Sequence, residues 1–436
     1  MHSIGRLILA ASIVFPVAAL HAAAAEDVRR PRVVVTTDGE IDDRCSMIRF
    51  LLYANEWEIL GLVHSSSKYH WKGNAEHPSH DWPDMVWLDK QLAAYEAVFP
   101  QLKQHDPRYP TADALRDLVF VGNVELEGDM REATPGSDQI VKVLLTEDSS
   151  PVWLQAWGGA NTIARALKTI RDEHPDRVDD VSDKAKIYMI SRQDKTYDEY
   201  IRKEWPNVDV LLSNSPSFGA IAYGWSKHQP QEVKEYFRRD WMEENLLKNH
   251  GPLLDLYEHK EWRFRSEGDS PAFLHVIDTG LRSDEDPTYG GWGGRFLPPK
   301  DHLYRSVDGK QPGPHSIIRW AIDFQNDWAA RADWCVKDLE QANHQPIVTL
   351  RHESDLTAKP GESVKLEVDA TDPDGDKLQF EWWQFTEAGT CPAAVTIKDA
   401  KTPKASFQVP DQVKPGETLH LVCTVSDDGS PPLTRY

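Results

Sequence analysis

The stretch VVVTTDGEIDDRCSMIRFLLYANEW, residues 33–57, decides the fold class of this chain. Its first five residues are β-branched, which is typical of a buried strand, and from Asp42 onward apolar residues recur at near-helical spacing. The pattern predicts a strand followed directly by a helix. Four acidic residues stand between or at the start of these elements, in residues 38–43. Polar chemistry is therefore expected at the carboxyl end of a strand.

The same alternation of strand and helix continues for about 180 residues. Further strands are expected at 59–63, 118–121, 152–157, 186–190 and 208–212, and helices at 85–99, 140–145 and 161–170. Strands interleaved with helices predict an α/β domain with a mostly parallel sheet and flanking helices. Ligands of such sheets bind beyond the carboxyl ends of the strands.

The pattern changes after a long helical stretch at 316–342, and residues 344–346 are interpreted as a linker. Short strands separated by Pro, Gly and Asp turns follow, which is typical of a small β-sandwich of the immunoglobulin type. These strands are expected at 348–350, 363–368, 378–383, 394–397, 405–409 and 419–425. We predict an α/β domain over 30–343 and a sandwich over 346–436.

The N-terminal residues predict export. Arg6 is followed by an apolar stretch at 7–20 and an alanine run at 22–25, the pattern of a signal peptide over residues 1–25. An uncleaved anchor is the alternative. Export to the periplasm or the medium permits disulfides. Cys391 and Cys423 are candidates for pairing, whereas Cys45 and Cys335 are expected to be buried thiols.

Charge excludes one class of partner. The chain has 49 Lys plus Arg against 70 Asp plus Glu, a net charge of −21, which disfavours binding to a nucleic-acid polymer. After the N-terminus no apolar run approaches the ~20 residues that a bilayer requires.

The 16 tryptophans suit a different partner, because sugar rings and nucleoside bases stack on aromatic rings. Trp71, Trp82, Trp87 and Trp292 are expected in or near loops at the mouth of the site, although core packing is the alternative for each. Of the consecutive pair Trp382-Trp383, one ring should enter the sandwich core. The other would form a glycan platform or pack on the main domain.

The acidic cluster at 38–43 points to a metal ion. Asp38, Asp42 and Asp43 with Glu40 would repel one another strongly without a cation, and oxygen ligands favour Ca²⁺ or Mg²⁺. The alternative is that one carboxylate caps the following helix. A second acidic segment, DPDGD at 372–376, is interpreted as a turn or as another Ca²⁺ loop.

Residues 36–43, TTDGEIDD, resemble the nucleoside hydrolase signature D-x-D-P-G-x-D-D in its last three aspartates. Thr36 replaces the first aspartate, and Gly39-Glu40 replaces the Pro-Gly pair. Residues 155–164, QAWGGANTIA, resemble the strand-turn-helix segment of that family, and 267–271, EGDSP, its late helix start. The whole pattern is similar to exported bacterial proteins described as cellulose-binding, which have a nucleoside-hydrolase-like domain and an immunoglobulin-like tail.

This resemblance implies a role for each matched residue. Asp42 would be the catalytic base, and Asp38, Asp43, Asp269 and the backbone carbonyl of Trp157 would hold Ca²⁺. A cation lowers the pKa of a water molecule, and an aspartate takes its proton. The residues expected to bind substrate are Lys68, His70, Asn123, Gln193, Asp194 and Trp292. His64 and His70 are candidates for protonating the leaving group.

The expected function is Ca²⁺-dependent hydrolysis of an N-glycosyl or related glycosidic bond. The substrate would be a small sugar or a nucleoside-like molecule, or a plant polysaccharide. Two alternatives remain: a non-catalytic carbohydrate-binding or cellulose-binding protein on the same scaffold, and a surface interaction protein in which the sandwich is the working part.

Overall fold

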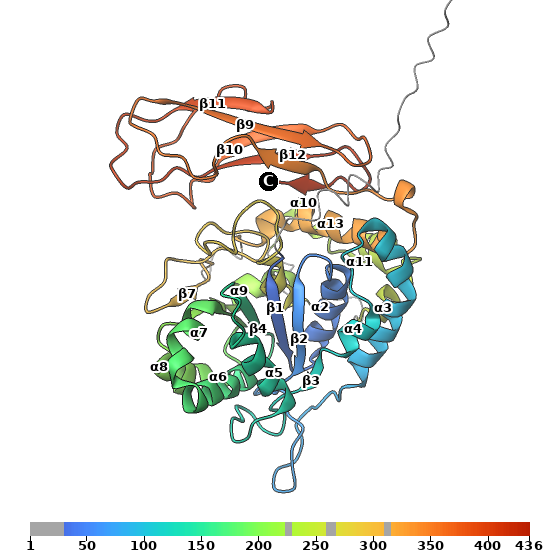
Figure 1. Cartoon of the computed structure of the whole chain (residues 1–436). Coiled ribbons are helices and arrows are strands. Elements are labelled where there is room, and N and C mark those ends of the chain that lie inside the picture. The colour runs from blue at the N-terminus through green and yellow to red at the C-terminus, as the bar shows by residue number, and fades with distance from the viewer. Residues whose placement is uncertain (1–29, 223–228, 259–266, 309–314) are drawn as a thin grey trace, which may run out of the picture.

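The computed structural model describes residues 30–222, 229–258, 267–308 and 315–436. The described residues form an α/β domain and a β-sandwich that lies against it (Figure 1). The predicted signal peptide, residues 1–25, lies outside the described residues. Within the described part of the chain, no helix combines the length and the apolar character that crossing a membrane requires.

A seven-stranded parallel sheet forms the centre of the first domain, in the order β3-β2-β1-β4-β5-β6-β7. The strands are β1 (Arg32–Thr37), β2 (Glu58–His64), β3 (Val119–Val121), β4 (Val152–Ala156), β5 (Ala185–Ile190), β6 (Asp209–Ser213) and β7 (Leu303–Arg305). The predicted α/β class is confirmed. Strand β7 was not predicted, because three residues at the edge of a sheet show no hydrophobic period that sequence analysis can detect.

Helices cover both faces of the sheet (Figure 1). Along β1, Val33 and Val35 enter the larger of two cores and Val34 enters the other, as strand alternation requires. The larger core packs under α2 (Ile41–Leu52), α3 (Val86–His105), α12 (Ser270–Leu274) and α13 (Ala321–Trp334). The other core packs under α5 (Pro135–Leu144), α6 (Asn161–Glu173) and α7 (Val178–Lys184).

The remaining helices are short. They are α4 (Ala112–Arg116), α8 (Arg202–Glu204), α9 (Ser215–Phe218), α10 (Gln231–Glu235) and α11 (Arg239–Met242). The long helix predicted over 316–342 is shorter than expected. A 3₁₀ turn at Ile318–Trp320 precedes α13, and α13 ends at Trp334.

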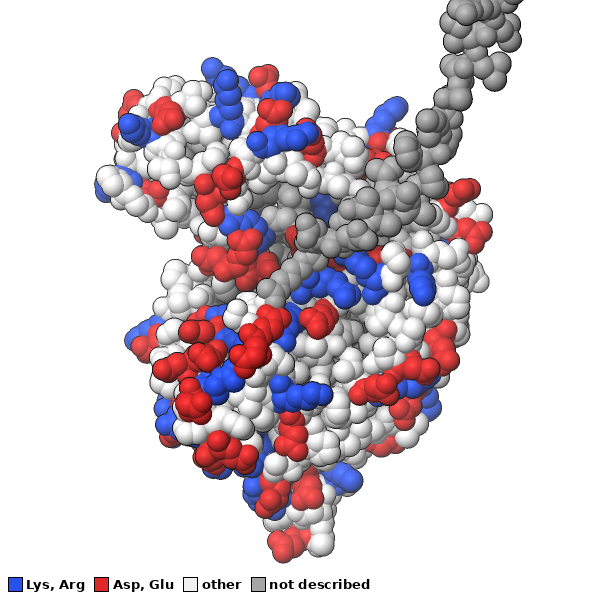
Figure 2. Space-filling model, in the orientation of Figure 1, with Lys and Arg blue, Asp and Glu red and all other residues white. Residues whose placement is uncertain are grey.

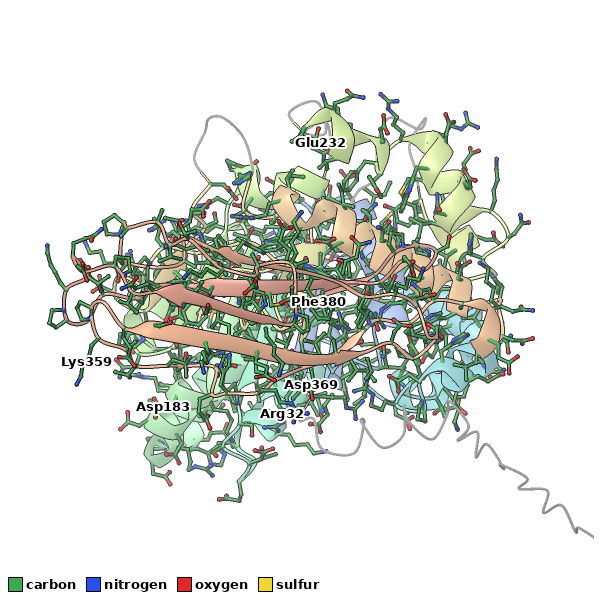
Figure 3. All side chains as sticks on the ribbon, turned by 90° about the horizontal axis from the view of Figure 1, so that it is seen from above. Arg32, Asp183, Glu232, Lys359, Asp369 and Phe380 are labelled. Atoms are coloured by element: carbon green, nitrogen blue, oxygen red, sulfur yellow. The ribbon has the colours of Figure 1, made fainter. Side chains whose placement is uncertain are left out.

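The C-terminal part is a sandwich of two three-stranded antiparallel sheets, β10-β12-β13 and β11-β9-β8. Its strands are β8 (Ile347–Leu350), β9 (Ser363–Thr371), β10 (Gln379–Gln384), β11 (Lys404–Gln408), β12 (Leu421–Ser426) and β13 (Thr434–Arg435). The strand predicted at 394–397 is absent from the described structure, where only an isolated bridge joins Lys398 to Ser406. From above, the sandwich strands lie across the α/β domain (Figure 3).

The candidate pair Cys391 and Cys423 does not form a disulfide in the structure. All four cysteines are buried free thiols. The backbone N–H of Cys391 bonds to the carbonyl of Thr418, which precedes β12, whereas Cys423 lies within β12 opposite Trp382. Cys423 instead packs in the sandwich core beside Trp382.

The junction between the domains is closely packed and aromatic. Trp320 contacts the rings of Trp383 and Tyr436, with centroids 6.2 and 5.2 Å apart, and the Arg319 guanidinium lies 4.2 Å from the Phe385 ring centroid. Trp382 is buried in the sandwich core and Trp383 packs on the main domain. This is the second of the two arrangements expected for the pair, with Trp383 partly buried against Trp320.

Candidate functional site

Four aspartates converge at the carboxyl edge of the sheet. Asp38 follows β1, Asp42 and Asp43 lie in the first turn of α2, and Asp269 precedes α12. Carboxylate oxygens of Asp42, Asp43 and Asp269 lie within 4.8 Å of one another. Asp38 and Asp269 are only 1% exposed, and Asp42 at 6% is the most exposed of the four. Residues more than 200 positions apart thus form one acidic cluster.

Small residues and one threonine hold these carboxylates together. The Thr37 hydroxyl donates to Asp43 and accepts from the backbone N–H of Gly39 at 3.1 Å. A Cβ on Gly268 would lie 2.5 Å from Asp42 Oδ2, and a Cβ on Gly158 would lie 2.8 Å from Asp38 Cγ. Both glycines are therefore needed for the close approach of backbone to carboxylate.

The electrostatics of the cluster fit a bound cation. Burial raises the pKa of Asp269 well above its usual value, and the charges of Asp42, Asp43 and Asp38 raise it further. Burial also raises the pKa of Asp43, followed by the charges of Asp38 and Asp42. The Oδ2 atoms of Asp38 and Asp269 are buried without a hydrogen-bond partner among the described residues. Buried carboxylates with free oxygens match the ligands that Ca²⁺ takes.

Helix capping does not account for the aspartates. The N-cap of α2 is Glu40 and that of α12 is Asp269, and neither makes a side-chain capping hydrogen bond. Asp42 and Asp43 follow within the first turn of α2, where the helix dipole favours negative charge. That effect does not bring Asp269 into contact with them.

The turn after β4 brings two predicted residues together. The side-chain amide of Gln193 donates to the carbonyl of Trp157, the backbone atom predicted to be a metal ligand. The Trp157 ring is buried, and its Nε1 donates to Gln155 Oε1 at 3.2 Å. Because Gly158 touches Asp38, this carbonyl lies next to the acidic cluster.

The two candidate acids have opposite protonation behaviour. Burial alone would lower the pKa of His70, but its hydrogen bond to Glu40 and the charge of Asp38 raise it to about 9. The His70 Nε2 lies 3.6 Å from Glu40 Oε2. Burial lowers the pKa of His64 to about 4, and both of its ring nitrogens lack a partner among the described residues. At neutral pH, His70 carries a proton that His64 lacks.

The other residues predicted to bind substrate differ in their solvent exposure. Lys68 is exposed, with Nζ 3.1 Å from the carbonyl oxygen of Arg192. Asn123 is buried, and its side chain bonds to Glu132 and Thr134. Asp194 accepts from the N–H and hydroxyl of Thr196.

Trp292 does not line a mouth. It is 1% exposed and packs in the larger core against Phe324, so the prediction that it binds substrate is wrong. Core packing, the alternative expected for this tryptophan, is what the structure shows.

Two family profiles match this chain. Residues 32–296 match "Cellulose-binding Sde182, nucleoside hydrolase-like domain", and residues 363–436 match "Cellulose-binding protein Sde0182, C-terminal domain". The chain belongs to the Sde182 family. The resemblance stated from the sequence is thereby confirmed. No curated protein sequence matches the chain.

The structure of this Sde182-family chain is similar to solved structures. One neighbour is a nucleoside hydrolase-related hypothetical protein from Saccharophagus degradans that is associated with carbohydrate metabolism. It is 28% identical, with a TM-score of 0.79 over 93% of this chain and 98% of that one. A plant nucleoside hydrolase is 12% identical (TM-score 0.35; 70% and 99% of the two chains). The effector XopQ with adenosine diphosphate ribose is 10% identical (TM-score 0.35; 75% and 100%).

Sequence reasoning missed several residues that support the site of this Sde182-family chain. Glu267, two residues before Asp269, forms a fully buried ion pair with Arg49, at 3.3 Å between Oε1 and NH1. The guanidinium of Arg49 also lies 4.4 Å from the ring centroid of Trp328. The sequence signal for this ion pair was Arg49 itself, a charged residue within the apolar run of the helix Ile41–Leu52. The partnership of Glu40 with His70 had no sequence signal, because the two lie on different loops.

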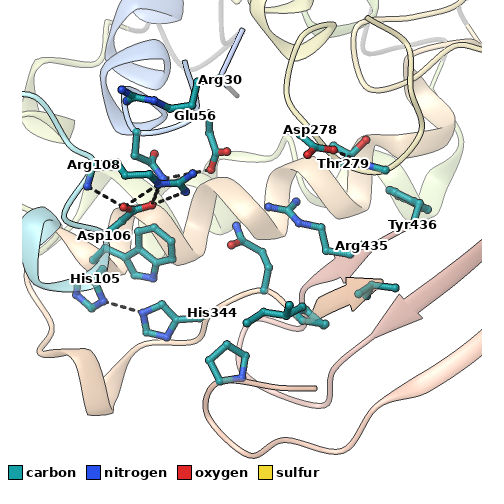
Figure 4. Close-up of a pocket in the computed structure, with 18 of the residues that line it drawn as sticks. Arg30, Glu56, His105, Asp106, Arg108, Asp278, Thr279, His344, Arg435 and Tyr436 are labelled. Carbon is teal, nitrogen blue, oxygen red and sulfur yellow. Dashed lines mark hydrogen bonds and ion pairs between the residues drawn. The ribbon is translucent and has the colours of Figure 1, made fainter. Parts of the chain in front are cut away.

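A pocket lies elsewhere, at the junction of the two domains (Figure 4). Its volume is about 290 Å³, and it is bordered by residues that precede β1 and β2, on the amino edge of the sheet. Several of its polar side chains bond to one another: Arg108 forms an ion pair with Asp106, and the rings of His105 and His344 share a hydrogen bond. The acidic cluster at the opposite edge remains the stronger candidate, because two of its buried oxygens, Asp38 Oδ2 and Asp269 Oδ2, lack a hydrogen-bond partner among the described residues.

The surface itself offers no extended basic region in the view of Figure 2. Acidic and basic side chains are interspersed over this face of both domains, with a notch between them at the left. The distribution agrees with the net charge of −21.

Proposed function

We propose that this chain is a Ca²⁺-dependent hydrolase of N-glycosyl or related glycosidic bonds. The observation that supports it is the convergence of Asp42, Asp43 and Asp269 within 4.8 Å in a buried setting. In the proposal, Asp38, Asp43, Asp269 and the Trp157 carbonyl hold the ion. A bound cation would neutralise the carboxylates and lower the pKa of a water molecule.

Asp42 is the best placed of the four to act as base. It is the most exposed member of the cluster, whereas Asp43 is engaged by the Thr37 hydroxyl. Asp38 and Asp269 present buried, unpartnered oxygens, which suit ion binding more than proton transfer. With the cation neutralising its neighbours, Asp42 stays ionised and accepts a proton from the attacking water.

His70 is the proposed acid for the leaving group. Its pKa of about 9 keeps it protonated at neutral pH, and it lies on the loop after β2, beside the cluster through Glu40. His64, with a pKa of about 4, has no proton to give at that pH. Lys68, Gln193 and Asp194 border the same edge and are proposed to contact substrate hydroxyls or to position the turn that does.

The test is Asp42→Asn in the full chain, assayed on nucleosides and oligosaccharides with and without Ca²⁺. The amide cannot accept a proton, so turnover should fall by about 10²–10⁴-fold, while the Ca²⁺-induced rise in melting temperature largely persists. Asp183→Asn, which removes an exposed carboxylate at the periphery of the α/β domain, is the matched control (Figure 3). Near-normal turnover in a folded Asp42→Asn protein would overturn the proposal.

One observation favours a second candidate, a non-catalytic cellulose-binding protein on this scaffold. Thr36 stands where the nucleoside hydrolase signature has an aspartate, and its hydroxyl is 3.3 Å from the carbonyl of Gln155, to which it donates. It is therefore not part of the acidic cluster. Retention of the wild-type chain on cellulose, combined with no hydrolysis of any tested substrate at saturating Ca²⁺, would select this candidate.

Export and domain organisation complete the proposal. Residues 1–25 would be removed as a signal peptide, the α/β domain would span 30–343 and the sandwich 346–436, and the mature protein would act in the periplasm or the medium. N-terminal sequencing of the protein from cell fractions tests this directly.

A further inference from the structure

A second acidic cluster lies in the sandwich, on the loop between β9 and β10. Carboxylate oxygens of Asp372, Asp374 and Asp376 lie within 4.8 Å of one another. Asp372 Oδ1 accepts the backbone N–H groups of Asp374 and Asp376, both at 2.9 Å, and Gly375 has a φ of +85°. These bonds shape the turn, but they leave the negative charges facing one another.

A buried aspartate from another strand adds independent support. Asp427 follows β12, is 2% exposed, and accepts the N–H groups of Gly429 and Leu433 with Oδ1 at 3.0 Å. Its Oδ2 is buried without a hydrogen-bond partner, as is Oδ2 of Asp372. Consecutive residues hold Asp427 beside the acidic loop: Asn343 Nδ2 donates to Asp427 Oδ1 at 3.1 Å, and the backbone N–H of His344 donates to Asp374 Oδ2 at 2.7 Å. Burial raises the pKa of Asp427, and the charge of Asp372 raises it further.

Within the described residues, the cluster has fewer positive charges than carboxylates. No Lys or Arg among them forms an ion pair with Asp372, Asp376 or Asp427, and the one ion pair at the cluster joins His344 to Asp374. Leaving such oxygens buried and unpaired is costly, because a desolvated carboxylate needs a cation or several donors.

We propose that Asp372, Asp374, Asp376 and Asp427 form a Ca²⁺ site in the sandwich, separate from the cluster at the carboxyl edge of the sheet. Four carboxylates without nitrogen or sulfur ligands favour Ca²⁺ over zinc. The loop before β10 carries three of the ligands, and Asp427 follows β12, whose last residue, Ser426, pairs with Gln379 at the start of β10.

The position of the site connects it to the domain junction. The backbone N–H of His344 donates to Asp374 Oδ2 at 2.7 Å, and Asn343 Nδ2 donates to Asp427 Oδ1 at 3.1 Å. His344 in turn stacks on Trp334, with ring centroids 5.1 Å apart, and bonds to His105 of the α/β domain. An ion that orders these aspartates therefore also orders the segment that joins the two domains.

The experiment counts Ca²⁺ by calorimetric titration of the full-length chain, comparing wild type with Asp376→Asn. The backbone N–H of Asp376 donates to Asp372 Oδ1, whereas its side chain makes no hydrogen bond within the described part of the chain, so the Asp376→Asn variant should fold normally. Titration reaches about 5 mM Ca²⁺, because extracellular modules bind at about 10⁻⁴–10⁻³ M. We expect Asp376→Asn to lose one bound ion, or to weaken its binding by about tenfold or more.

The controls separate this site from the one in the α/β domain. Asp411→Asn removes an exposed carboxylate of the same sandwich outside the cluster and should leave the titration unchanged. Asp269→Asn should remove a different ion, so the double variant Asp269→Asn/Asp376→Asn loses both. Unchanged Ca²⁺ stoichiometry and affinity in Asp376→Asn would overturn the sandwich site, whatever becomes of the hydrolase proposal.

Discussion

Replacing Asp269 by Asn should stabilise the Ca²⁺-free protein while removing its response to Ca²⁺. Asp269 is fully buried, with one unpartnered oxygen, and lies within 4.8 Å of the carboxylates of Asp42 and Asp43. Like charges in such a setting oppose folding, whereas a cation placed among them favours it. The amide keeps the shape of the side chain and removes the charge. Asp269→Asn should therefore raise the stability of the Ca²⁺-free protein and lower that of the Ca²⁺-bound protein.

The magnitude follows from the geometry. Two unit charges within 4.8 Å of each other repel by at least about 3.5 kcal/mol at an effective dielectric constant near 20. The full repulsion is not felt, because the raised pKa of Asp269 lets the folded protein hold a proton there instead. Each unit of pKa shift corresponds to about 1.4 kcal/mol. We therefore expect a net gain of about 1–3 kcal/mol at pH 8 in chelator, and a rise of a few degrees in melting temperature.

Thermal unfolding at pH 8, in chelator and in Ca²⁺, is the assay, with Asp183→Asn as the control for loss of an exposed carboxylate. Wild type should gain stability on addition of Ca²⁺, and Asp269→Asn should gain much less. A variant that melts below wild type in chelator, or that keeps the full response of this site to Ca²⁺, would refute the idea of a repulsive cluster neutralised by an ion. The sandwich site contributes equally to both proteins and cancels in the comparison.

Two further predictions concern pH and the junction. Asp43 and Asp269 have raised pKa values in the folded state. The stability that they contribute is therefore present below the unfolded-state pKa of about 3.9 and is lost as the pH rises through the folded-state pKa. In chelator, the stability difference between Asp269→Asn and wild type should grow from pH 5 to pH 8, and a flat difference would contradict this. Trp382→Ala should lower the free energy of unfolding by about 3–5 kcal/mol, and Trp383→Ala by less, since Trp383 is only half-buried against Trp320. Both variants should bind cellulose as wild type does. A stable Trp383→Ala protein that no longer binds cellulose would restore the hypothesis of a glycan platform.

The sheet could be predicted because each buried parallel strand is a continuous run of β-branched and apolar residues. Val33 to Val35 and the strands after them have both faces covered by helices, so hydrophobicity alone marks them. The three-residue strand β7 and the break between the 3₁₀ turn at Ile318–Trp320 and α13 leave no such mark. Tertiary packing decides both.

The acidic cluster could be predicted only in part. The loop at 38–43 is contiguous, so its charge density is visible in the sequence, whereas Asp269 was placed through its resemblance to a family segment. Trp292 was misassigned because a glycine-rich setting suggests an exposed loop, yet Gly293 has no room for a Cβ against His275 and the tryptophan is buried. The contact of Glu40 with His70 depends on how two loops meet, which no local pattern encodes.

The sandwich and the acidic cluster lie at opposite edges of the parallel sheet, and this constrains how a carbohydrate would reach the aspartates. Residues of the sandwich line one pocket together with residues 30–31 and 55–56, which precede β1 and β2, whereas the acidic cluster follows the carboxyl ends of the strands. A polymer held by the sandwich would therefore lie across the molecule from the aspartates. Aromatic groups close to the cluster belong instead to the loop after β2, where Tyr69 is 48% exposed and Trp71 stacks on His80 at 4.3 Å between ring centroids. Because His70 belongs to the same loop, recognition of a sugar and proton donation to its leaving group would depend on one segment of the chain, independently of the sandwich.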